Sequence, residues 1–139
     1  MKVTVTIAAR TTCDGDTQTT TQTLSGFLRA LDESIEVTYR EPSGEEGLGN
    51  TLTMLRVFST RLELTRQGDY SGALVLEKGV RHETPYATPF GKLMMTTDTT
   101  RFDSTLSKDG TGTVDISYTL EAGGGQSTHD LLVNVRPVS

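Results

Sequence analysis

The stretch Tyr86–Thr100 reads YATPFGKLMMTTDTT and places a tight turn between two extended segments. Pro89 fixes its own φ and favours an extended conformation at the residue before it. Gly91 accepts a positive φ at no steric cost, which tight turns commonly require. We therefore predict that the chain arrives extended, reverses at Pro89–Gly91 and leaves as a strand through Lys92–Thr97.

The residues at the apex of this turn and after it lead to two further predictions. Phe90 lies at the apex, and we expect its ring to plug one end of a hydrophobic core, because an exposed, unsupported Phe favours aggregation. Beyond Thr97, the polar residues near Asp98 predict a second turn, followed by a separate strand through Arg101–Ser107.

The length and composition of the chain indicate one all-β domain that spans residues 1–139. The chain has 139 residues, of which 34% are hydrophobic, and it contains 14 Gly and no Trp. This length suits a single domain. The many Thr residues favour strands because Thr is β-branched.

Alternating apolar and polar residues predict a series of half-buried strands. The clearest sets are Val3–Ala9, Ile35–Tyr39, Val114–Leu120 and Leu131–Val135. Consecutive hairpins without long crossovers predict an antiparallel up-and-down β-barrel of roughly eight to ten strands.

Glycine-rich segments mark the connections between these strands. Asp14-Gly15 and Lys108-Asp109-Gly110 are hairpin signals, and Gly26 indicates a bend or bulge in the long return from the first hairpin. Glu41–Asn50, with one Pro and three Gly, is predicted to be a flexible loop.

Charge and cysteine content argue against several classes of protein. The net charge is −5 with a pI of about 5.0, so the surface repels phosphate backbones and we expect no nucleic-acid partner. Cys13 is the one cysteine, so no intramolecular disulfide forms.

The start MKVTVTIAAR lacks the apolar core of a signal peptide, and no stretch has the roughly 18–20 apolar residues of a membrane span. We expect a cytoplasmic protein with no membrane partner; a secreted protein whose signal has been removed is the alternative.

The central stretch also resembles a known family. The run Tyr86-x-Thr88-Pro89-Phe90-Gly91, followed by a strand and by the Thr-rich segment Thr96–Thr100, is similar to the YwiB-like bacterial proteins. Weaker points of resemblance, spread over nearly the whole chain, are Gly26, Tyr39-Arg40-Glu41, Arg66-x-Gly68 and His129.

This resemblance implies a fold without implying an activity. The YwiB-like family is uncharacterised and has a calycin, that is a lipocalin-like, β-barrel. No catalytic residue is therefore carried over to this chain. By analogy at the level of the fold, a calycin barrel suggests a cavity for a small molecule.

Five residues are candidates for a ligand site inside such a barrel. Arg56, Arg66 and His82 each share a strand face with apolar residues, and Tyr86 and Tyr39 add hydroxyl groups. Arg suits a carboxylate or phosphate because its planar fork pairs with two oxygens at once. In the alternative interpretation each Arg lies at a strand end in water or pairs with Glu63 or Glu77. On Leu52–Phe58 both faces carry apolar residues, so the sequence leaves open which face is interior.

The sequence offers little support for a metal, a cofactor or catalysis. Cys13, His82 and His129 have no zinc-ligand spacing, and Asp14-Gly15-Asp16 lacks the rest of a calcium loop. There is no G-x-S-x-G nucleophile motif, and no His adjoins Cys13 in sequence. We expect no metal, no cofactor and no enzymatic activity.

Two functions remain open. The first is a cytoplasmic barrel that binds a small amphipathic or anionic ligand in its interior. The second is an interaction module with a filled barrel, acting through its loops or as a homodimer. Cavity volume distinguishes them, because a void of several hundred Å³ fits a ligand pocket.

Overall fold

The structure, a computed structural model, describes residues 1–41 and 50–138, so most of the predicted loop Glu41–Asn50 lies outside the described residues. The described residues form ten β-strands and no helix. Their bounds are β1 Lys2–Cys13, β2 Asp16–Ala30, β3 Ile35–Arg40, β4 Thr51–Val57, β5 Arg61–Gly68, β6 Ser71–Glu77, β7 Arg81–Thr88, β8 Gly91–Ser104, β9 Gly112–Ala122 and β10 Gly125–Pro137.

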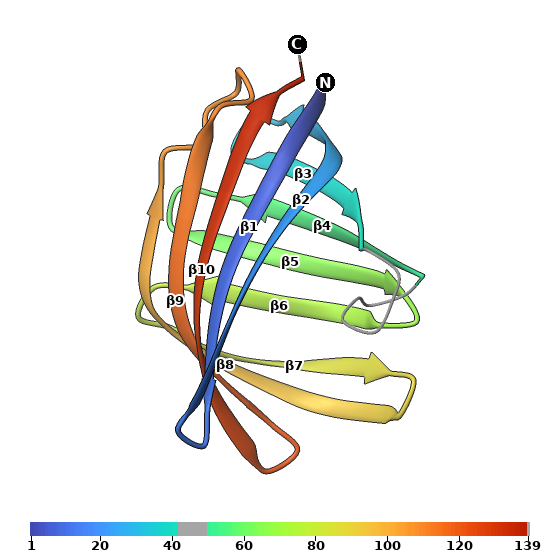
Figure 1. Ribbon diagram of the computed structural model, residues 1–139, viewed down its shortest axis with the longest axis vertical. Helices are drawn as coiled ribbons and strands as arrows, with labels where there is room; N and C mark the ends of the chain where they lie inside the picture. The colour runs from blue at the N-terminus through green and yellow to red at the C-terminus, as the bar shows by residue number, and fades with distance from the viewer. Residues whose placement is uncertain (42–49, 139) are drawn as a thin grey trace.

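The strands form a closed antiparallel barrel in which sequence neighbours are also spatial neighbours (Figure 1). The order is β1-β10-β9-β8-β7-β6-β5-β4-β3-β2, and the pairing of β1 with both β2 and β10 completes the ring. The prediction of an all-β, up-and-down barrel of eight to ten strands is confirmed.

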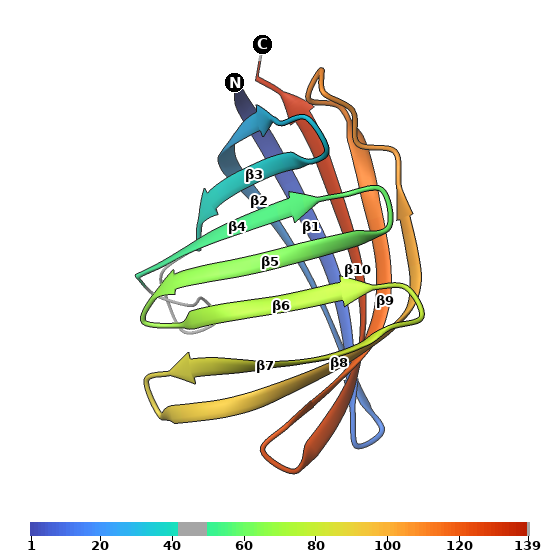
Figure 2. The ribbon, with the colours of Figure 1, turned by 180° about the vertical axis from the view of Figure 1, so that it is seen from behind.

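The barrel has a long-stranded half and a short-stranded half. Strands β1, β2, β8, β9 and β10 have 11 to 15 residues each, whereas β3 to β7 have six to eight. Figure 2 shows the short strands β3 to β6 running across the long strands β1, β9 and β10. The long β1–β2 and β9–β10 hairpins extend together beyond this crossing, toward the end of the barrel opposite the two termini (Figure 1).

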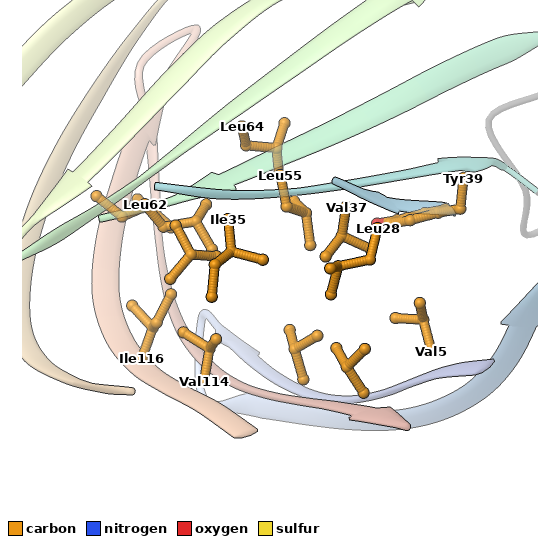
Figure 3. Close-up of a cluster of buried hydrophobic side chains, with 14 of the residues drawn as sticks. Val5, Leu28, Ile35, Val37, Tyr39, Leu55, Leu62, Leu64, Val114 and Ile116 are labelled. Atoms are coloured by element: carbon orange, nitrogen blue, oxygen red, sulfur yellow. The ribbon is translucent and has the colours of Figure 1, made fainter. Parts of the chain in front are cut away.

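The hydrophobic core fills the end of the barrel near the termini. Alternation places Val3 and Val5 of β1 inside, where both are fully buried. Figure 3 shows the side chains of Val5, Leu28 and Val37 pointing into one shared space. Each such apolar side chain that leaves water contributes roughly 1.5–3 kcal/mol, which is enough to specify the inward face of each strand.

The two hairpin turns predicted at Asp14-Gly15 and at Pro89–Gly91 are present. Asp14 and Gly15 have φ values of 52° and 83°, the left-handed pair that a two-residue hairpin of this kind requires. The second turn joins Thr88 to Gly91. The expectation that Phe90 plugs the core is wrong, because its side chain is 93% exposed. With only Pro89 and Phe90 between paired strands, the ring projects from the hairpin tip.

The predicted turn near Asp98 is also wrong. β8 continues through this position to Ser104, and a β-bulge between Thr99 and Arg101 shifts its register with β9 instead. A bulge absorbs one extra residue and bends the strand without ending it. Asp98 itself stays in regular register with Thr119 of β9, and its carboxylate accepts a hydrogen bond from Arg81 at 3.1 Å on the surface.

Gly26 marks a close approach of strands, and no register shift accompanies it. It pairs with Val3 of β1 and with Tyr39 of β3, at the point where β2 acquires its second neighbour. A Cβ atom at Gly26 would lie 2.8 Å from the carbonyl oxygen of Thr38. Of the predicted bend or bulge, the bulge is therefore absent, and Gly26 instead provides a tight contact that only Gly permits.

Threonine side chains complete the junction between β6 and the β7–β8 hairpin. In the described part of the chain, β6 pairs with β7 through Ser71 and Gly72 alone. Beyond this point, the Thr84 hydroxyl donates to the Ala73 carbonyl at 2.5 Å, and the Thr97 hydroxyl donates to the Val75 carbonyl at 2.7 Å. These two side chains bind carbonyl groups that would otherwise lack a partner.

We expect Thr97→Val to lower the free energy of unfolding by about 1–3 kcal/mol, because it removes the side-chain donor of the part-buried Val75 carbonyl. Thr99→Val is the matched control. The Thr99 hydroxyl is buried and has no hydrogen-bond partner within the described residues, so its removal should be neutral or stabilising. Urea unfolding of both variants measures the difference, and an equal loss in the two would contradict this account of the junction.

Candidate functional site

The half of the interior away from the termini contains a cavity of about 400 Å³. Its wall is mainly apolar and comes from both halves of the barrel. The apolar lining residues are Ile7, Ala9, Leu55, Leu62, Leu64, Leu74, Leu76, Met95, Ile116, Leu120, Leu131 and Val133. The polar ones are Gln22, Tyr39, Glu41, Arg66, Tyr70, Tyr86, Thr88, Tyr118, His129 and Asp130.

Strand alternation carries Arg66 into this cavity. Leu62 and Leu64 of β5 face the interior and are buried, and Arg66 is the next residue of the same parity. Its side chain is 21% exposed. The guanidinium therefore lies in the wall where the apolar interior gives way to solvent.

Arg66 is held by a small hydrogen-bonded group. Its Nη1 donates to the Tyr86 hydroxyl at 2.9 Å, and its Nε donates to the Thr53 hydroxyl at 3.4 Å. Thr53 in turn donates to the Glu41 carboxylate at 2.6 Å. The distance from Arg66 Nη2 to the same Glu41 oxygen is 3.6 Å, so the ion pair is direct but long.

The electrostatics keep Arg66 charged and the Tyr39 phenol neutral. Burial acts to lower the pKa of Arg66, but the Tyr86 hydroxyl and the Glu41 carboxylate outweigh it and the net shift is upward. Burial and the nearby Glu41 raise the pKa of Tyr39. Within residues 1–41 and 50–138, no group hydrogen-bonds to the Tyr39 hydroxyl, so it faces the cavity as an unused donor.

A second polar group lies on β9 and β10. The rings of Tyr118 and His129 stack with their centroids 4.8 Å apart and an interplanar angle of 10°. His129 Nε2 lies 2.7 Å from the Ser127 hydroxyl, and Nδ1 lies 3.3 Å from the Thr11 hydroxyl. Burial lowers the pKa of His129, against the opposing effect of Asp130, and burial raises the pKa of Tyr118 to about 12. Both rings are therefore neutral at pH 7.

The structure brings together three of the five residues predicted as ligand contacts. Arg66, Tyr86 and Tyr39 all line the cavity. The partner of Arg66 is Glu41, in place of the Glu63 or Glu77 considered from the sequence. Glu41 continues the inward parity of Val37 and Tyr39, which places its carboxylate beside the guanidinium.

Arg56 and His82 do not line the cavity. In β4 the odd-numbered residues are buried, so Arg56 lies on the outer face, where its guanidinium contacts the Glu36 carboxylate at 3.0 Å. Burial acts to raise the pKa of Glu36, but the bonds from Arg56 and Arg29 lower it overall. His82 lies near the start of β7, with Nε2 2.9 Å from Glu77.

Several lining residues were not predicted as ligand contacts from the sequence, namely Glu41, Tyr70, Tyr118 and His129. A signal was present for two of them. Tyr118 belongs to the regular alternation Val114–Leu120, and Glu41 follows Tyr39 at a spacing of two. His129 has a neighbouring carboxylate in Asp130, which also borders the cavity, but Ser117 and Arg10 bind this carboxylate.

The arrangement is suited to holding a ligand by one polar end. An apolar wall surrounds the space, while a guanidinium and phenolic hydroxyls occupy one side of it. Among residues 1–41 and 50–138, no three His, Cys, Asp or Glu side chains come together as ligands for a metal ion. The described chain also contains no helix long and apolar enough to cross a membrane.

Comparisons with known proteins place this barrel beside uncharacterised relatives. Residues 5–132 match the family model described as a domain of unknown function, DUF1934. The fold matches the crystal structure of the ywiB protein from Bacillus subtilis with a TM-score of 0.87 and 19% sequence identity, over 99% of this chain and 92% of that one. No curated protein matches. The resemblance to YwiB-like proteins inferred from the sequence is confirmed.

Proposed function

The chain belongs to the DUF1934 family, and we propose that it binds one small amphipathic anion inside its barrel. The observation that carries this proposal is the position of Arg66 in the wall of a cavity of about 400 Å³. Pockets for small ligands are typically about 300–1,000 Å³, mainly apolar, with few polar groups that fix orientation. The interior of this barrel has that composition.

The expected pose follows from the distribution of polar groups. The apolar part of the ligand lies against Leu64, Leu74 and their neighbours, and the anionic group lies at Arg66. Charge-assisted hydrogen bonds from a guanidinium are strong, particularly where water is partly excluded. The Tyr39 hydroxyl supplies a further donor.

Glu41 lowers the affinity of this site for an anion, because its carboxylate already forms an ion pair with the Arg66 guanidinium. An incoming anion competes with the Glu41 carboxylate, which lies 3.6 Å from the guanidinium. The long distance leaves the ion pair weak enough to exchange, whereas the 2.9 Å bond to Tyr86 fixes the orientation of the fork. Removing the charge of Glu41 should therefore strengthen binding of an anion.

The test uses anilinonaphthalene sulfonate, an amphipathic anion whose fluorescence reports binding. Arg66→Met should weaken its affinity about 10- to 100-fold, the equivalent of one lost charge-assisted bond of roughly 1.5–3 kcal/mol. Glu41→Gln should strengthen it. Arg56→Met, which removes the same charge from the outer face, should leave the affinity unchanged.

The double variant Arg66→Met/Glu41→Gln guards against misfolding, because it removes both partners of the ion pair together. Its circular dichroism should match that of the wild type while its affinity for the sulfonate stays low. Equal affinity in wild type, Arg66→Met and the double variant would contradict the proposal.

The proposal also covers the cellular location, the barrel class and the catalytic activity of the protein. We further propose that the protein acts in the cytoplasm, that it is a calycin barrel by architecture, and that it binds its ligand without catalysing a reaction. The alternative, an interaction module with a filled interior, is supported by the exposed Phe90 at the tip of the β7–β8 hairpin. The cavity favours the binding protein.

A further inference from the structure

Strand β2 has a long edge that no strand covers within the described part of the chain. From Asp16 to Ser25 it pairs with β1 alone, since β3 pairs with β2 only from Gly26 to Ala30. Most of these residues are exposed. Figure 1 shows this part of β2 extending with β1 away from β3. Its backbone N–H and C=O groups on the outer side are therefore available to another strand.

This edge lacks the features that usually prevent strands from pairing with other chains. Exposed edges in soluble proteins commonly carry Lys, Pro or a bulge, or remain short. Between Asp16 and Arg29 the sequence contains neither a charged residue nor a proline. The register of β2 with β1 is continuous throughout, so no bulge twists the edge away.

The sequence of the edge is complementary to itself. Thr17–Thr23 reads TQTTTQT, which is identical in both directions about Thr20. When two identical strands pair antiparallel across a two-fold axis at Thr20, each residue lies opposite its own residue type. Opposed Thr pairs stabilise a sheet, and opposed Gln amides both donate and accept hydrogen bonds.

We propose that this edge is a dimerisation surface whose occupant is β2 of a second copy of the chain. The two strands pair antiparallel with Thr20 on the two-fold axis, which joins the sheets of two barrels. Each copy uses the same edge, so the contact closes at a dimer and does not propagate. Gln22 lies within the pairing segment and also lines the cavity, so the interface adjoins the ligand site.

Sedimentation velocity of the wild type, Thr20→Lys and Thr128→Lys tests the proposal. The wild type should be a dimer. Thr20→Lys places two lysines opposite one another on the axis and should raise the dimer dissociation constant at least about tenfold. Thr128→Lys is the matched control. Thr128 is exposed on β10, but β10 is paired on both sides at this position, with Thr12 of β1 and with Thr119 of β9. It should remain dimeric.

A second pair of variants tests the register and does not depend on Thr20. The proposed pairing sets Thr19 opposite Thr21 of the second copy. Thr19→Lys/Thr21→Glu should therefore remain dimeric, with opposite charges facing each other, whereas Thr19→Lys/Thr21→Lys should dissociate. A monomeric wild type at its highest soluble concentration, a fully dimeric Thr20→Lys, or equal behaviour of the two double variants would overturn the proposal.

Discussion

Gly72→Ala should lower the free energy of unfolding by about 4 kcal/mol. Gly72 has a φ of 147°, a conformation that side chains rarely adopt and that costs of order 1–3 kcal/mol. A Cβ atom there would lie 2.9 Å from the Pro85 carbonyl oxygen and 2.8 Å from Cδ2 of Tyr86. Crowding of this kind typically costs a further 1–3 kcal/mol or so.

The size of this effect follows from the place of Gly72 in the barrel. It provides one of the two backbone pairs between β6 and β7 in the described chain. Moving Tyr86 would also disturb the 2.9 Å bond that holds Arg66. The variant should therefore bind anilinonaphthalene sulfonate more weakly as well as unfold at lower urea.

Gly79→Ala is the control for Gly72→Ala. Gly79 also has a positive φ, of 78°, but a Cβ atom there meets nothing within 4 Å. It should cost only about 1–2 kcal/mol, the intrinsic penalty of that conformation. Chemical unfolding measures both variants, and equal losses would show that the contact with β7 contributes nothing.

Leu28→Trp and Leu74→Trp should have opposite outcomes although both leucines are buried, at 5% and 6% exposed. Leu28 lies in the packed end of the barrel, where Figure 3 shows its side chain among Val5, Val37 and their neighbours. A larger side chain there strains the core, and we expect a loss of more than about 3 kcal/mol.

Leu74 instead lines the cavity of about 400 Å³, so an indole ring has room without strain. Leu74→Trp should change the free energy of unfolding by less than about 1 kcal/mol, because filling a void restores contacts that its lining lacks. Differential scanning calorimetry compares the two variants. Equal destabilisation would mean that the interior is uniformly packed and would remove the cavity from the account.

The sequence was sufficient for the barrel because alternation and turn chemistry agree along most of the chain. The set Val114–Leu120 predicted a half-buried strand, and β9 buries Val114, Ile116 and Tyr118 as that pattern requires. Alternation also places Arg66 on the inner face of β5, because Leu62 and Leu64 on the same face are apolar and buried. Where one face of a strand is clearly apolar, the sequence alone predicts which residues point into the barrel.

The same reasoning could not place Arg56, because both faces of β4 carry apolar side chains. Leu52 and Met54 share the outer face with Arg56, and the choice of face depends on packing between strands. Its partner, Glu36, lies opposite Arg56 on β3 although 20 residues separate them in sequence. Strand register of this kind depends on the whole sheet.

Two local errors have distinct physical causes. Near Asp98, the polar residues predicted a turn, but the chain forms a bulge there, because β8 continues to pair with β9 beyond it. At the β7–β8 hairpin, a two-residue connection leaves no chain to fold Phe90 back onto the core. Local composition predicts that the backbone departs from a regular strand. Pairing with the neighbouring strand determines whether this departure is a bulge or a reversal of the chain.

Native mass spectrometry of the wild type and Leu74→Trp, each titrated with anilinonaphthalene sulfonate, tests the central claim most directly. If the cavity is the binding site, the wild type should take up one molecule per chain and Leu74→Trp should take up none at the same concentration. Uptake that is equal in the two proteins would place binding elsewhere on the molecule and would contradict a ligand site inside the barrel.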